Sequence, residues 1–421
     1  MTETSNASYE IKGVRTVPLG WIDFSRNDRN KVLGVLDRLS EQGTLDELGI
    51  APVRDGFADL FFPGTSTIQT RAKYFLIVPY AMKDLEQGTE TNPNRLQSIL
   101  NETEKRCAES LVEKEKEDSG IIGSRSLSQG GWVKRTPSSI YWTGLRSYGI
   151  FTGGGISLSE YLRSICALKT RKAGLRKLGN RNDKAEDESE KDDSDAGELF
   201  KKHFWTVPTY QPDWLDFLRL QLTEEEGQYL KHQIIMSQPD SMLAFILKNS
   251  LVDILSVENF RELKGLIRMF PEKIQQDYFL AVSFSEFLFV LRVLYNMILS
   301  AGENKRANTE WKSIRMQLPE TAAVDLEKII QKLYLQRNPD LCVFLRRAQN
   351  AMLLSDEEEL KNLIKKREKD LKGSRAKTLH PGEFKPNEWL GGEYLDYRFS
   401  NAKTIIRDIF ESEGQHVQSK L

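Results

Sequence analysis

Residues 278–299 read YFLAVSFSEFLFVLRVLYNMIL, an almost unbroken apolar run in the C-terminal half of the chain. A run of this length is able to cross a lipid bilayer as a helix. However, Glu286 and Arg292 lie near its middle, and each would cost about 2.5–3.5 kcal/mol at that depth. Ser285 and Asn296 add further polar groups. We therefore predict the central buried helix of a soluble domain, and no membrane span.

The sequence on both sides of this run also indicates helices. Thr223 and Glu226 have the spacing of a capping box, in which each residue satisfies a backbone N–H at a helix start. Further apolar stripes with helical spacing predict helices near 240–250, 258–269, 278–300, 306–316, 321–336, 339–353, 356–371 and 401–412. Few runs in this half alternate with period two, so we expect a multi-helix bundle over residues 201–421.

A chain of 421 residues exceeds what one hydrophobic core usually organises, so we expect a separate N-terminal domain over residues 1–168. The overall class is mainly α, with α+β possible in this half because Leu19–Phe24 reads as a short strand. Expected helices cover Arg54–Phe62, Ile68–Val78 (closed by Pro79) and a long charged segment opened by Asn92-Pro93.

A winged-helix-like unit is expected near residues 93–165. Thr136-Pro137 is a typical helix start, and Gly149 followed by Ile150 is a typical helix end. The glycine-rich segment 151–156 then predicts a short hairpin, which gives the element order of a winged helix.

The distribution of charge is uneven in the middle of the chain. Between Ser119 and Asn182 there are eleven Lys and Arg residues against a single acid, Glu160, although the formal net charge of the whole chain is only −1. The next segment, Asp183–Glu198, holds nine acids and two lysines. Because residues 169–200 are poor in apolar side chains, we expect a charged flexible linker there.

The basic segment predicts a surface that attracts a polyanion such as DNA. Cationic side chains would contact phosphates and aromatic rings would stack on unpaired bases. The candidate residues are Lys134, Arg135, Tyr141, Trp142, Arg146, Arg163, Arg171 and Lys172. Two alternatives remain open: the cations are only a solvated face, or they bind an acidic protein partner.

A second cluster in the sequence comprises Arg54, Asp55, Asp59, Arg71 and Lys73. Asp55 and Asp59 are four residues apart and so share one face of a helix, an arrangement that could bind Mg²⁺ in a divergent nuclease. Interlocking salt bridges are the simpler interpretation. The chain has no phosphate-binding loop and its four histidines lack the spacing of metal ligands, so we expect no metal and no cofactor.

The three cysteines, Cys107, Cys166 and Cys342, are far apart and form no paired motif, which fits a reducing compartment. The N-terminal residues lack the basic and apolar regions of a secretory signal. We therefore expect a cytoplasmic protein.

Several strings resemble an uncharacterised prokaryotic "domain of unknown function" family. They are Leu19–Ser25, Arg54–Phe75, Pro137–Trp142 with Leu145 and Gly149-Ile150, Leu395–Arg398 and Asp408-Ile409. The resemblance implies a bacterial anti-phage defence island, with a helicase, a phospholipase-D-like nuclease or a methyltransferase encoded nearby. It implies no catalytic residue, because the family has no assigned activity.

Together these features predict an accessory subunit of an anti-phage defence system, more in keeping with a non-enzymatic role than with catalysis. It would bind DNA or scaffold a complex with a helicase or a phospholipase-D-like nuclease. The alternatives are a protein–protein adaptor that never contacts nucleic acid and a divergent metal-dependent nuclease.

Overall fold

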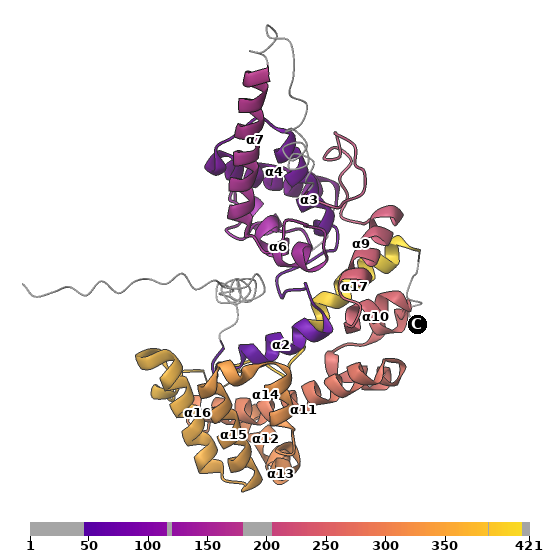
Figure 1. Ribbon diagram of the computed structural model, residues 1–421. Helices are drawn as coiled ribbons and strands as arrows, with labels where there is room; N and C mark the ends of the chain where they lie inside the picture. The colour runs from indigo at the N-terminus through magenta and orange to yellow at the C-terminus, as the bar shows by residue number, and fades with distance from the viewer. Residues whose placement is uncertain (1–45, 116–119, 180–203, 386, 415–421) are drawn as a thin grey trace, which may run out of the picture. The chain divides into compact units, whose positions relative to one another are not determined.

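The computed structural model describes residues 46–115, 120–179, 204–385 and 387–414. All the described residues belong to one compact unit, Gln42–Leu421. These residues are mainly helical and contain no β-strand (Figure 1). The expected strand at Leu19–Phe24 lies outside them.

The helices of the first half follow the predicted starts in most cases. Asn92 caps a long helix, since its side chain accepts hydrogen bonds from the backbone N–H groups of Asn94 and Arg95. The helices are α2 (Ala51–Phe61), α3 (Tyr74–Gln87), α4 (Pro93–Lys114), α5 (Ser124–Leu127), α6 (Pro137–Ser147) and α7 (Leu158–Gly179). Residues 169–179, expected to begin the linker, therefore continue a helix, and the rest of that segment up to residue 200 is outside the described residues.

The prediction that Pro79 closes a helix starting at Ile68 is wrong. The helix α3 begins only at Tyr74 and continues through Pro79 to Gln87. Proline lacks the N–H that would bond to the carbonyl of Phe75, which normally disfavours this position. Every residue from Tyr74 to Met82 is buried, so we attribute the tolerance to the packing of this apolar helix.

The expected wing of a winged helix is not formed. Phe151 pairs instead with Trp205 as an isolated antiparallel bridge. The N–H of Thr152 donates to the carbonyl of Phe204 at 2.8 Å, and the N–H of Thr206 donates to Ile150 at 3.0 Å. Burial of aromatic rings from both segments explains the choice, because Phe151 and Trp205 lie 5.0 Å apart by ring centroid inside a larger aromatic cluster.

The second half is helical as predicted, with some shorter elements. The capping box of Thr223 and Glu226 is present. The α-helices are α9 (Glu224–Ser237), α10 (Met242–Lys248), α11 (Glu272–Leu299), α12 (Lys305–Ile314), α13 (Leu318–Thr321), α14 (Leu326–Lys332), α15 (Pro339–Leu353), α16 (Glu357–Lys372) and α17 (Phe399–Ser412). Short 3-10 turns are η1 (Val252–Ser256), η2 (Phe260–Gly265), η3 (Ile267–Met269), η4 (Arg315–Gln317), η5 (Leu335–Arg337), η6 (Gly373–Arg375) and η7 (Lys377–Leu379), so the expected helix at 258–269 is a pair of such turns.

The apolar helix α11 is long and apolar enough to cross a membrane, but 67% of its most apolar window is buried inside the protein. Its polar side chains bond to the segment 390–395. Ser285 accepts a hydrogen bond from the N–H of Leu395 at 2.7 Å, and Asn296 both donates to and accepts from the backbone of Leu390 at 2.8 Å. These contacts support the predicted buried core helix.

Candidate functional site

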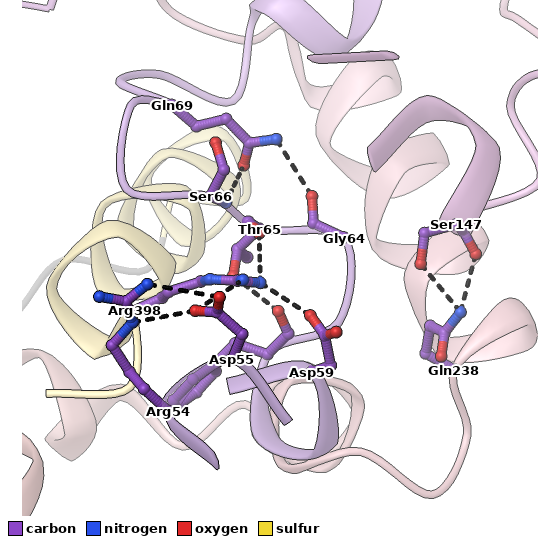
Figure 2. A network of polar contacts seen from close by, with 11 residues as sticks. Arg54, Asp55, Asp59, Gly64, Thr65, Ser66, Gln69, Ser147, Gln238 and Arg398 are labelled. Carbon is purple, nitrogen blue, oxygen red and sulfur yellow. Dashed lines mark hydrogen bonds and ion pairs between the residues drawn. The ribbon is translucent and has the colours of Figure 1, made fainter. Parts of the chain in front are cut away.

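The predicted cluster between Arg54 and Lys73 is a network of ion pairs, and part of it involves Arg398 at the start of α17. The Arg398 guanidinium donates to Asp59 at 2.8 Å and to the carbonyl of Thr65 at 2.9 Å (Figure 2). It also lies 3.5 Å from Asp55, which pairs with Arg54 at 3.0 Å. Both carboxylates therefore face arginines, in agreement with the salt-bridge interpretation.

The other two members of this cluster have different partners. The Arg71 Nε lies 3.0 Å from Asp408, whose carboxylate also accepts the N–H of Ala72 at 2.7 Å. Burial raises the pKa of Asp408 although Arg71 opposes the shift. Lys73 pairs with Glu226 at 2.5 Å. Each candidate ion thus has its own counter-ion, and no group of metal-ligating side chains occurs among the described residues.

The cationic candidates divide into two sets. Lys134, Arg163, Arg171 and Lys172 are exposed and form no ion pair or hydrogen bond through their side chains within the described part of the chain. Arg135 and Arg146 are only half-exposed and interact within the protein. Helices α6 and α7 pack against each other, and Lys134 lies three residues before the start of α6.

Helix α7 presents Arg163 and Arg171 away from its buried residues, whereas Lys172, nine residues after Arg163, lies on the opposite side of the helix from Arg163. Its buried residues are Tyr161, Leu162, Ile165 and Cys166. Arg163 and Arg171, eight residues apart, are both exposed. At 3.6 residues per turn this spacing brings them to the same broad face of the helix.

The two aromatic candidates are core residues, so the expectation that they stack on bases is contradicted. Tyr141 is fully buried, and its hydroxyl accepts the N–H of Thr70 at 2.9 Å and donates to the carbonyl of Arg71 at 2.7 Å. Trp142 is 5% exposed and donates to the carbonyl of Ile156 at 3.1 Å. A buried ring has no free face for a base.

The sequence reasoning missed a buried carboxyl group, Glu104, below the N-terminus of α6. Its Oε1 accepts the N–H of Ser138, and its Oε2 is buried without a hydrogen-bond partner. Burial raises its pKa to about 7. The signal was its helical spacing from the apolar residues Leu100 and Cys107, which places it on the buried face of α4.

Comparison with known families finds a match in the first half of the chain. Residues 17–180 match the model of a family of unknown function, DUF6361. The DUF6361 match includes α2 to α7. It therefore contains the cationic candidates for DNA binding and the cluster from Arg54 to Lys73. No curated protein and no solved structure matches the chain.

The C-terminal strings of the resemblance lie outside the DUF6361 match, yet they contact it. Arg398 binds Asp55 and Asp59, and Asp408 binds Arg71. In addition, the Asn401 side chain donates to the carbonyl of Gln69 at 2.9 Å. Helix α17 and the residue before it therefore contact α2 and the loop before α3, both of which lie within the DUF6361 match.

Proposed function

We propose that the protein is a non-enzymatic subunit that binds DNA by contacts to the phosphate backbone of the DNA. The observation that carries this proposal is the set of exposed cations Lys134, Arg163, Arg171 and Lys172, which lack counter-ions in the described part of the chain. We name these four residues the α6–α7 cations. Exposed cations of this kind neutralise phosphates and gain free energy from the release of counter-ions.

The one acidic residue between Ser119 and Asn182, Glu160, bonds to the start of its own helix. The Glu160 carboxylate accepts hydrogen bonds from the N–H of Ser157 at 2.8 Å and from its hydroxyl at 2.9 Å. These contacts use the carboxylate to cap the start of α7. Lys169 does not belong to the free cations, because its ammonium group donates to the carbonyl of Leu85 at 2.5 Å.

Binding would depend on phosphates and not on bases. The buried rings of Tyr141 and Trp142 remove the stacking platform that single-stranded recognition uses. The described residues also lack the wing of a winged helix, because Phe151 forms a β-bridge with Trp205. A winged-helix mode of reading bases is therefore not expected. We therefore expect duplex DNA to bind with little sequence preference and with strong salt dependence.

The biological setting rests on the resemblance alone. On that ground we propose an accessory role in a bacterial anti-phage defence system, beside a helicase or a phospholipase-D-like nuclease. The nuclease alternative lacks free metal ligands at this pair, because Asp55 and Asp59 both face Arg398.

A second candidate function is a protein–protein adaptor. The observation that favours it is the exposed apolar surface at α15, where Val343 is 53%, Leu353 49% and Leu354 71% exposed. Exposed apolar side chains that gather on one element are typical of interaction sites. In that case a neighbouring gene product would co-purify with the chain, and labelled DNA would not bind.

The test is a titration of labelled duplex DNA across salt concentrations. Reversal of the α6–α7 cations to Glu should weaken binding and reduce the slope of log K against log salt by up to about 0.9 per lost phosphate contact. The matched control reverses Lys248, Lys264, Arg268 and Arg315, which are also exposed and unpaired among the described residues. Equal affinity and equal slope in the two variants would reject the proposal.

A further inference from the structure

A cleft of 370 Å³ lies between the residues before α2, the middle of α11 and the segment 389–396. This volume is at the lower end of what small-molecule sites in proteins offer. Its lining combines apolar side chains such as Leu288 and Leu390 with several charged groups. None of these residues belongs to the α6–α7 cations, so the cleft is independent of the proposed function.

Three of the charged groups that line the cleft, Glu47, Arg54 and Glu393, have counter-ions. Glu47 pairs with Lys377 at 2.8 Å, and Glu393 pairs with Arg306 at 2.6 Å. The Asp46 carboxylate accepts the N–H groups at the start of α2, at 2.8 Å and 2.6 Å.

Of the two arginines in the lining, Arg54 pairs with Asp55 and Arg292 has no counter-ion among the described residues. The Arg292 guanidinium donates to the carbonyl of Glu393, and no carboxylate lies within ion-pair distance of it among the described residues. Burial lowers its pKa to about 10, although the charges of Asp46 and Glu393 act in the opposite direction. Arg292 is partly exposed, and a partly buried cation without a direct counter-ion gains more from an added anion than a fully solvated one does.

The backbone beside Arg292 leaves room for such an anion. Gly391 and Gly392 have φ angles of +83° and +80°, which side-chain-bearing residues rarely adopt. A Cβ atom built on Gly392 would lie 3.8 Å from the guanidinium carbon of Arg292. Glycine at this position therefore keeps the space over the guanidinium open.

The aromatic residues of the cleft are held in place from outside it. Arg306 lies over the ring of Trp389, 4.1 Å from its centroid, and Arg261 lies 3.8 Å from the ring centroid of Tyr394. Phe289 stacks on the same Tyr394 ring at 4.1 Å. These contacts make the segment 389–396 a fixed wall, which reduces the entropy lost when a ligand binds.

We propose that this cleft binds a small organic anion, with a carboxylate or phosphate group of the ligand paired with Arg292. The apolar part of the ligand would lie on Leu288 and Leu390. A planar fork of N–H donors suits either group, because carboxylate and phosphate oxygens both accept paired hydrogen bonds from a guanidinium.

The experiment measures binding of matched charged and neutral probes to the full chain by calorimetry and by thermal shift. The charged probes are 5′-AMP and benzoate, and their neutral counterparts are adenosine and benzamide. We expect at least one charged probe to bind and its neutral counterpart to bind at least tenfold more weakly, as expected for a charge-assisted hydrogen bond. Failure of both charged probes to bind at millimolar concentration would overturn the proposal.

The site is assigned with two further measurements. Arg292→Gln should weaken the charged probe at least about tenfold, whereas Arg346→Gln, which removes an exposed cation paired with Glu327, should leave binding unchanged. In the wild-type protein, the bound probe should also protect Arg292 from phenylglyoxal, as measured by peptide mass spectrometry. This second measurement does not depend on the variant's folding, and unprotected Arg292 with a saturating probe would place the anion elsewhere and reject the assignment.

Discussion

The buried Glu104 predicts a specific dependence of stability on pH. Its side chain is fully buried, and burial raises its pKa from an ordinary 4.5 to about 7, against the effect of the hydrogen bond from the N–H of Ser138. The folded state therefore holds the Glu104 proton more tightly than the unfolded state does. The stabilisation is fully present below about pH 4.5 and is lost as the pH rises to about 7.

The size of this effect follows from the shift. A difference of about 2.5 pKa units at 1.36 kcal/mol per unit corresponds to roughly 3 kcal/mol over the whole range. Between pH 5 and pH 8 roughly 2–3 kcal/mol of it should be lost, because the unfolded carboxyl is already partly ionised at pH 5. Above the folded pKa both states are ionised, and this group contributes no further slope.

The assay is urea unfolding of the wild-type protein, Glu104→Gln and Glu113→Gln at pH 5, 6, 7 and 8. Glu113 is exposed on the same helix and serves as the matched control. From pH 5 to pH 8 the free energy of unfolding should fall by roughly 2–3 kcal/mol more in the wild type than in Glu104→Gln. The control should follow the wild type. Parallel curves for Glu104→Gln and the wild type would refute the reasoning.

Two further predictions concern the ion pairs that join distant parts of the chain. Arg398→Gln, which leaves Asp55 and Asp59 without their shared partner, should lower the free energy of unfolding by about 2–4 kcal/mol in urea denaturation; a loss under about 0.5 kcal/mol would show the network to be without consequence. Lys73→Met should cost about 3–5 kcal/mol because Glu226 is left buried and charged, and adding Glu226→Gln should restore more than half of that loss; if the double variant is less stable than Lys73→Met, the explanation by an unpaired charge is wrong.

The sequence predicted those helices whose signals are local. Asn92-Pro93 and the pair Thr223 and Glu226 opened helices where their capping chemistry indicated. The polar residues of the apolar run also argued correctly for a core helix. Arg292 and Asn296 donate hydrogen bonds to the backbone of Glu393 and Leu390. The apolar run alone does not predict these partners, because they lie about a hundred residues later in the chain.

The errors arose where contacts between distant residues decided the outcome. Pro79 stays inside α3 because every residue from Tyr74 to Met82 is buried, and Phe151 pairs with the distant Trp205 instead of forming a hairpin. The partner of Asp59 is Arg398, 339 residues away, and no local pattern connects them. Loop closure over such separations is paid for by tertiary packing, which short sequence windows do not contain.

Protection of lysines from acetylation by bound duplex DNA tests the central claim most directly, because it uses the unmodified chain and reads individual side chains. Lys134 and Lys172 should be acetylated more slowly in the presence of DNA at low salt, and the protection should disappear as the salt concentration rises. The exposed Lys248 and Lys264 should react at the same rate with and without DNA. Unchanged rates at Lys134 and Lys172 with DNA in excess, or equal protection of all four lysines, would contradict the account.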